Sequence, residues 1–169
     1  MTITYRDGAP GDLPAIDALF RESFSDTFAH LYKPEDLASF FDNFTPEAWA
    51  EEMADGRYAF RLAETDGRLV GFCKFGPPSV PVETNADRAE LRQIYILKEW
   101  HGHGIAQVLM DWAIAEARRR HVRELYLTVY VDNLRAQRVY ERYGFEPVGR
   151  YDFMVGNHAD QDIIMRLTL

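Results

Sequence analysis

The fold of this chain is decided by the stretch Trp100-His101-Gly102-His103-Gly104-Ile105-Ala106. An apolar run, residues 90–97, precedes it, and an amphipathic pattern, residues 105–120, follows it. This order predicts a strand, a glycine-bearing turn and a helix. The first turn of a helix has N–H groups without intrahelical partners, and the helix dipole adds partial positive charge there. Because glycine lets a backbone approach a ligand closely, the stretch predicts a phosphate-binding cradle.

Two common phosphate-binding motifs do not match this cradle. A P-loop needs Gly-Lys-Ser/Thr, whereas Gly104 is followed by Ile105. The dinucleotide fingerprint needs a third glycine where Gln107 stands. His101 and His103 have the spacing of a His-x-His metal site, but no acidic or cysteine ligand supports them at a suitable local spacing. The sequence therefore predicts phosphate binding and no metal.

Length and composition predict one globular domain over residues 1–169. Apolar residues make up 47% of the chain and aromatic residues 14%, which is typical of a packed core. No apolar run approaches the roughly 20 residues of a membrane span, and the first residues lack a signal-peptide core. For these reasons we expect no membrane partner. The single Cys73 excludes an internal disulfide, so we expect a protein of the reducing cytoplasm. The net charge of −8 argues against a nucleic-acid partner.

The acidic excess lies in one segment, which runs from Asp17 to Asp55. Its acidic side chains are opposed there by Arg21 and Lys33 alone. Two interpretations stay open. The segment can form solvated amphipathic helices, or it can attract a cationic ligand toward a binding site.

The pattern of apolar residues predicts a mixed α/β (α+β) fold. Asp12, Pro34, Thr45-Pro46 and Asn133 mark helix starts in addition to the helix after Gly104. Expected strands cover residues 2–6, 58–64, 68–75, 90–97, 124–131, 145–155 and 162–169, with residues 156–160 connecting the last two. A strand–helix–strand crossover at the cradle implies one parallel pair, whereas the expected hairpins imply antiparallel pairs. We expect a twisted, mostly antiparallel sheet of about seven strands with helices on both faces.

A second motif follows the cradle and reads Asn133-x-x-Ala136-x-x-x-Tyr140-x-x-x-Gly144-Phe145. The two motifs together resemble those of the GNAT family of N-acetyltransferases. The acyl-CoA loop of that family reads Gln/Arg-x-x-Gly-x-Gly/Ala. His101 departs from this pattern, because it stands where the family has Gln or Arg.

The resemblance implies acetyl-CoA as co-substrate and assigns residues to its binding. Those residues come from the strand, the loop and the second motif: Ile94, Tyr95, Ile96, His101, Gly102, His103, Gly104, Ile105, Ala106, Gln107, Asn133, Ala136, Tyr140 and Arg142. In the family, the Asn caps a helix and bonds the pantetheine arm, and the Tyr hydroxyl lies beside the thioester sulfur. An acid at the position of Glu90 often serves as base. The family also bulges this strand, which frees N–H groups near residues 94–96 for the thioester oxygen.

Each of these residues also has a plain structural interpretation. Tyr140 lies on the apolar stripe of its helix and can be a core residue. Glu90 can be a surface residue of its strand. Asn133 can be a helix cap without a ligand.

The resemblance is closest to the Pai-type bacterial spermidine/spermine acetyltransferases. It rests on residues 22–28, Ile94-Tyr95-Ile96, His103-Gly104, Phe153-Met154 and residues 162–165. It implies transfer of an acetyl group to a primary amine of a small molecule, with a polyamine as one acceptor. Relatives of this kind often form homodimers through their last strands. The alternatives are a peptide N-terminus, a protein lysine or an antibiotic amine as acceptor, or a non-catalytic acyl-CoA sensor.

Overall fold

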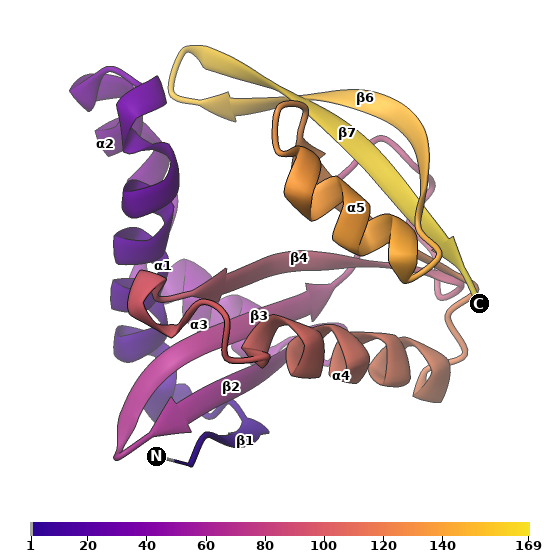
Figure 1. Cartoon of the computed structure of the whole chain (residues 1–169), viewed down its shortest axis with the longest axis horizontal. Coiled ribbons are helices and arrows are strands. Elements are labelled where there is room, and N and C mark those ends of the chain that lie inside the picture. Colours follow the sequence, from indigo (N-terminus) through magenta and orange to yellow (C-terminus); the bar gives the residue numbers. More distant parts are fainter. Residues whose placement is uncertain (1) are drawn as a thin grey trace.

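The computed structural model describes residues 2–169, and these form one seven-stranded sheet in the order β1-β2-β3-β4-β5-β7-β6 (Figure 1). The strands are β1 Thr4–Asp7, β2 Ala59–Thr65, β3 Arg68–Gly76, β4 Arg88–Ile96, β5 Glu124–Tyr130, β6 Glu146–Val155 and β7 His158–Thr168. Strands β4 and β5 pair in parallel, and the other neighbours in the sheet pair antiparallel. The predicted fold class is therefore confirmed.

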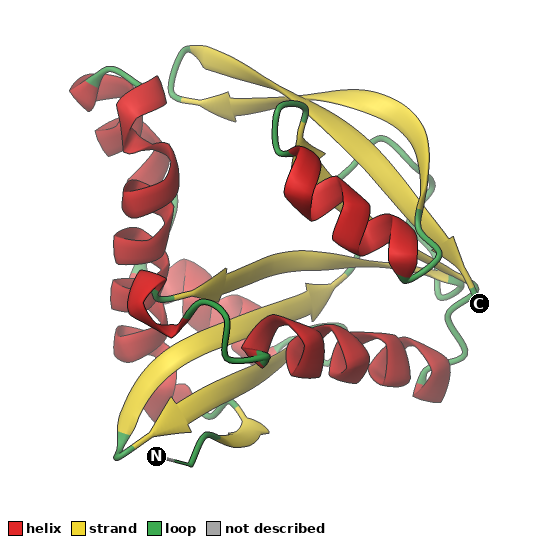
Figure 2. Cartoon of the chain, viewed as in Figure 1, coloured by secondary structure: helices red, strands yellow, loops and turns green. Residues whose placement is uncertain are grey.

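Helices cover both faces of this sheet (Figure 2). They are α1 Leu13–Phe28, α2 Pro34–Phe41, α3 Pro46–Ala54, α4 Ile105–Arg119 and α5 Leu134–Arg142. One core cluster joins α4 to the sheet through buried residues such as Leu109 and Leu125, and Tyr140 of α5 packs against it. The other joins the first three helices to the opposite face through Phe20, Phe24 and Trp49, which are at most 2% exposed. Burial of such large side chains stabilises each face by a few kcal/mol per residue, roughly 1.5–3 for each.

Two of the predicted helix caps form as expected. The side chain of Thr45 accepts the Ala48 N–H at 3.1 Å, and the side chain of Asn133 accepts the Ala136 N–H at 3.2 Å. Asp12 is the N-cap residue of α1, as predicted, but its side chain accepts no N–H of that helix. Its carboxylate instead accepts the Ala9 N–H at 2.8 Å and pairs with Arg6 at 2.8 Å, because the chain makes a 3-10 turn before α1.

The predicted connection over residues 156–160 is too long. Gly156 and Asn157 alone form the turn, so β7 begins at His158 rather than at Asp162. Gly156 has a φ of +57°. Asp36 of α2 packs against this glycine and accepts the Asn157 N–H at 3.0 Å. A side chain at position 156 would collide with α2, so glycine is needed there for the turn to lie against Asp36. The hydrogen bond from Asn157 to Asp36 then holds the short turn in place.

Candidate functional site

Strands β4 and β5 pair over a short length and then diverge. Their register covers Arg88–Glu90 against Glu124–Tyr126. Beyond these residues β4 continues to pair with β3, and β5 continues to pair with β7. Figure 1 shows the two halves of the sheet spreading apart, with α4 beside β4 and α5 beside β7. A gap edged by backbone polar groups therefore begins at Glu90.

A β-bulge in β4 decides which side chains face each side of the sheet. The register against β3 shifts between Lys74 and Phe75, and Arg92 is the extra residue. Simple alternation would put Glu90 on the face of Ile94 and Ile96. That alternation is wrong for this strand, because Ile94 and Ile96 pack toward α4, whereas Glu90 lines a cavity on the opposite face. The bulge expected from the family resemblance is confirmed.

The bulge also aims backbone groups into the gap. The Leu97 N–H donates to the Val70 carbonyl of β3 at 3.0 Å. Since successive residues of a strand point their N–H and C=O groups to opposite edges, those of Ile94 and Ile96 face away from β3. They face the gap into which a thioester could extend.

The predicted cradle lies at the end of this gap. Gly102 and Gly104 have φ values of +81° and +78°, in the left-handed region that favours glycine. Gly104 is the N-cap of α4, and the first intrahelical bond runs from the Val108 N–H to its carbonyl at 3.2 Å. The N–H groups of residues 105–107 precede that bond and lack intrahelical acceptors. Gly102, His103, Gly104, Ala106 and Gln107 are exposed, whereas Ile105 is buried in the core.

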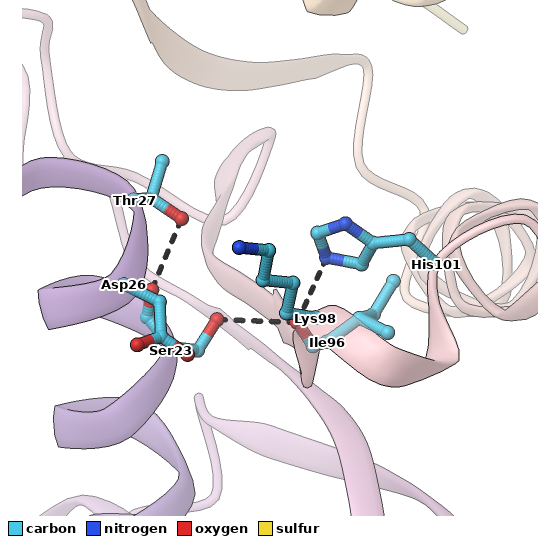
Figure 3. A pocket seen from close by; sticks show the side chains of 6 residues that line it. All are labelled: Ser23, Asp26, Thr27, Ile96, Lys98 and His101. Carbon is cyan, nitrogen blue, oxygen red and sulfur yellow. Dashed lines mark hydrogen bonds between the residues drawn. The ribbon is translucent and has the colours of Figure 1, made fainter.

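His101, the departure from the family motif, ties the loop to the end of β4. Its Nε2 lies 3.0 Å from the Ile96 carbonyl oxygen, which also accepts the Ser23 hydroxyl of α1 at 3.3 Å (Figure 3). These residues line a small pocket of about 140 Å³ together with Asp26, Thr27 and Lys98. The Lys98 side chain extends into this pocket beside the imidazole (Figure 3). The pocket therefore brings a cationic side chain next to the cradle. His103 Nδ1 lies 3.1 Å from the His101 carbonyl oxygen.

The second motif lies across the gap from β4. Asn133 begins α5, Ala136 contributes the capped N–H, and Tyr140 lies in the last turn of the helix. The Tyr140 ring packs edge-on against Phe145 with centroids 6.1 Å apart, and burial raises the pKa of its hydroxyl. Burial raises the pKa of Tyr95 as well, and Tyr140 and Asp162 add to this effect through their charges.

Glu90 is a buried carboxylate at the point where the gap begins. It is 4% exposed and accepts both the N–H of Ser79, at 2.8 Å, and its hydroxyl, at 3.0 Å. Burial raises the pKa of Glu90, whereas Ser79 and the positive charge of Arg92 oppose that rise. A raised pKa makes a carboxylate a stronger proton acceptor than a free one, so Glu90 can serve as a base.

Glu90 lines a cavity of about 380 Å³ beneath α1, α2 and α3. Its walls are aromatic, with Phe20, Trp49 and Tyr95 among them. Its charged lining consists of Glu51, Glu52, Glu90, Lys74 and Arg92. Lys74 is 2% exposed and pairs with Glu52 at 2.8 Å, and burial lowers the pKa of its ammonium. The cavity thus combines aromatic faces with carboxylates, an arrangement that suits an amine.

The acidic segment serves several purposes in the structure. Asp17 pairs with Arg21 at 2.9 Å, and Asp36 holds the β6–β7 turn. Asp26 lines the pocket beside the cradle, whereas Glu51 and Glu52 line the larger cavity. Some acidic side chains of this segment thus make contacts within the protein and others line the two cavities, and the attraction of a cationic ligand stays a prediction.

Arg142 is the last of the residues that the family resemblance assigned to acetyl-CoA binding. Arg142 is exposed at the end of α5, where its Nε donates to the Arg138 carbonyl at 3.3 Å and has no recorded contact with the cradle. Its neighbour Tyr143 instead reaches the Gln107 carbonyl at 3.5 Å.

Three residues that line the cavity were not predicted, namely Ser79, Gln93 and Lys74. No local spacing links a loop serine or a β3 lysine to Glu90. In the part of the chain that the structure describes, no three metal-ligating side chains cluster, and no helix has the length and hydropathy of a membrane span.

Comparisons with known proteins agree with this geometry. The model of the acetyltransferase (GNAT) family matches residues 13–145. An N-acetyltransferase of Mycobacterium tuberculosis is 35% identical over 133 residues, which cover 78% of this chain and 81% of that protein. The spermine/spermidine N(1)-acetyltransferase of Bacillus subtilis is 29% identical over 90 residues, or 52% of this chain and 59% of that protein.

A solved structure agrees in fold over the whole chain. The PaiA N-acetyltransferase of Thermoplasma acidophilum, crystallised with coenzyme A, superposes with a TM-score of 0.80 at 24% identity and covers 100% of both chains. The diverging β4–β5 pair and the glycine cradle at α4 are thus set in a fold that this acetyltransferase shares. Since the family model covers most of the sequence, the chain belongs to the acetyltransferase (GNAT) family.

Proposed function

We propose that this protein transfers the acetyl group of acetyl-CoA to a primary amine. The observation that carries the proposal is the gap between β4 and β5, which begins at Glu90 and ends at the Gly102–Gly104 cradle. The exposed N–H groups at the start of α4 suit the pyrophosphate, because they are unpaired and lie at the positive end of the helix dipole. The edge of β4 at Ile94 and Ile96, with Asn133 opposite, would hold the pantetheine arm.

Glu90 is the proposed base. An aliphatic ammonium has a pKa near 10, so it must lose a proton before it attacks the thioester carbon. The Glu90 carboxylate faces the cavity and its raised pKa suits proton acceptance, directly or through one water. As the amine attacks, negative charge develops on the thioester oxygen, and a β4 N–H that faces the gap would stabilise it.

Tyr140 is the proposed partner of the leaving sulfur. The attacking nitrogen loses its second proton to water, the C–S bond breaks as the tetrahedral intermediate collapses, and the thiolate of coenzyme A is released. A thiol has a pKa near 8.5 and tyrosine one near 10, and burial raises that of Tyr140 further. Full proton transfer from this hydroxyl is therefore uphill, so we expect Tyr140 to stabilise the thiolate by a hydrogen bond.

The acceptor class that we propose first is a polyamine. The aromatic walls and the Glu51 carboxylate of the 380 Å³ cavity suit ammonium groups. The likeness to the Bacillus subtilis spermine/spermidine acetyltransferase supports the same class.

Thiol release from acetyl-CoA, measured with a panel of amines, tests the function. The panel contains spermidine, spermine, an amino sugar, a lysine peptide and a peptide with a free N-terminus. We expect release with the polyamines at a higher kcat/KM than with either peptide. A higher value with a peptide would reject the polyamine, and binding of acetyl-CoA without release on any amine would favour a sensor.

A further inference from the structure

Gln93 lines the acceptor cavity and has a side-chain oxygen without a hydrogen-bond partner. It follows the Arg92 bulge on β4 and lines the cavity together with Glu90 and Tyr95. Its side-chain oxygen is buried and, within residues 2–169, has no hydrogen-bond partner. A buried acceptor without a donor is unfavourable, so such an atom beside a cavity points to a donor that a bound ligand supplies.

The two cations that line the same cavity do not supply that donor. Lys74 lies directly across from Gln93 in the β3–β4 register, but its ammonium donates to Glu52 at 2.8 Å and lies 5.0 Å from the centre of the Trp49 ring. Arg92 donates to the Pro77 carbonyl at 2.9 Å and lies over the Tyr58 ring. Both side chains are thus held by groups other than the Gln93 oxygen.

We propose that Gln93 binds the acceptor amine: its terminal amide turns the oxygen from its buried position toward the cavity, where the oxygen accepts an N–H of the ammonium or amine. This inference rests on the proposed function and names a residue that fixes the orientation of its acceptor. An amine has two or three N–H donors, so one can reach Gln93 while another is directed to Glu90. The nitrogen lone pair that forms after proton loss can then point toward the gap between β4 and β5.

Substitution by methionine tests this role, because methionine keeps the length of the side chain and removes the acceptor oxygen. For Gln93→Met we expect a rise in the amine KM of roughly ten- to a hundredfold, the loss expected for a hydrogen bond to a charged group. The Kd for acetyl-CoA should stay unchanged. Gln93→Glu keeps an acceptor oxygen, so its amine KM should stay within a few fold of wild type. Gln161→Met on β7 is the matched control, since that side chain bonds Asp152 at 2.7 Å outside the cavity.

Thermal unfolding separates this role from a structural one. A buried oxygen without a partner is unfavourable in the folded chain, so Gln93→Met should leave Tm unchanged or raise it. A drop in Tm with unchanged amine KM would overturn the inference and assign Gln93 to the core. An unchanged amine KM in an enzyme that turns over would overturn it as well.

Calorimetric binding of spermidine keeps the two proposals distinct. If wild type binds spermidine without releasing thiol and Gln93→Met loses that binding, the proposed function fails and the inference holds. If wild type acetylates amines and Gln93→Met binds them equally well, the inference fails and the proposed function holds. If wild type neither binds nor acetylates any amine, both fail.

Discussion

Ser79 holds the carboxylate of Glu90 with two donors, its N–H at 2.8 Å from Oε1 and its hydroxyl at 3.0 Å from Oε2. Ser79 lies just after β3, and Glu90 lies in β4, so the contact closes the loop between the two strands over the cavity. These bonds favour the ionised form of Glu90, whereas burial favours the protonated form. The pKa of Glu90 therefore depends on the balance between the two effects.

Removal of the Ser79 hydroxyl should shift that balance. In Ser79→Ala the burial effect is opposed by fewer hydrogen bonds, so the pKa of Glu90 should rise further. Because a base acts only when it is ionised, the acidic limb of the kcat/KM profile should move to higher pH. The plateau above that limb should change little. A pH profile of wild type and Ser79→Ala measures this shift, and Glu90→Gln should lose most activity across the profile. An acidic limb at the same pH in Ser79→Ala would show that Glu90 is not the titrating base.

Tyr140→Phe tests the proposed stabilisation of the thiolate. The ring and its packing against Phe145 remain, whereas the hydroxyl is removed. The loss of a hydrogen bond to a charged group predicts a fall in kcat of roughly tenfold or more, with no change in the Kd for acetyl-CoA. Single-turnover thiol release and calorimetry measure the two quantities.

Tyr5→Phe is the control for this substitution. Tyr5 lies on β1, far along the sheet from α5, so its hydroxyl should contribute nothing to turnover. Equal kcat values for the Tyr140 and Tyr5 variants would remove Tyr140 from the mechanism.

Local sequence signals were sufficient to predict most of the fold. The predicted starts of α3, α5 and α4 agree with the structure. Each start is marked by residues that specify a backbone conformation by themselves: Thr45-Pro46, Asn133, and Gly102 with Gly104. The β6–β7 turn was misplaced because its brevity depends on Asp36, which is far away in sequence. Asp12 occupies the predicted N-cap position of α1, but Arg6 and the backbone of Ala9 engage its carboxylate, because a 3-10 turn precedes the helix.

The residues of the candidate site likewise differ in whether the sequence alone could predict them. The cradle, Asn133 and Tyr140 lie in two short motifs and could be predicted. The faces of β4 could not be obtained by alternation, because the bulge at Arg92 moves Glu90 and Ile94 to opposite faces. The contacts of Ser79, Lys74 and Gln93 depend on tertiary packing and leave no periodic signal.

Asp162 makes the stability of the fold depend on pH. It is 7% exposed on β7, and burial followed by the charge of Asp160 raises its pKa from 3.8 to about 7, against a hydrogen bond from Thr128. Asp160 itself accepts from the Tyr32 hydroxyl and pairs with His158 at 3.1 Å. Between about pH 4 and 7 the folded chain retains a proton that the unfolded chain has lost. Raising the pH through this window therefore reduces the free energy of unfolding.

Asp162→Asn should remove this penalty. The Tm of the variant should equal or fall below that of wild type near pH 4 and exceed it by roughly a few degrees at pH 8. Thermal unfolding by circular dichroism at several pH values measures the difference. Asp152→Asn is the control, because that exposed carboxylate on β6 bonds Gln161 at the surface. A difference in Tm that does not change with pH would contradict the shifted pKa.

The relative importance of side chain and backbone in the cradle can be measured with two substitutions. His101 bonds the Ile96 carbonyl at 3.0 Å and so steadies the loop, but the proposed phosphate contacts come from backbone N–H groups. His101→Ala should therefore weaken acetyl-CoA binding by about two- to tenfold, the effect of one neutral hydrogen bond. Gly104→Val places a β-branched residue at a φ of +78°, a conformation that is unfavourable for valine. The substitution should therefore distort the start of α4. We expect it to abolish measurable binding in calorimetry while the rest of the fold remains, as checked by circular dichroism. A larger loss in His101→Ala than in Gly104→Val would mean that the imidazole itself is the main phosphate contact.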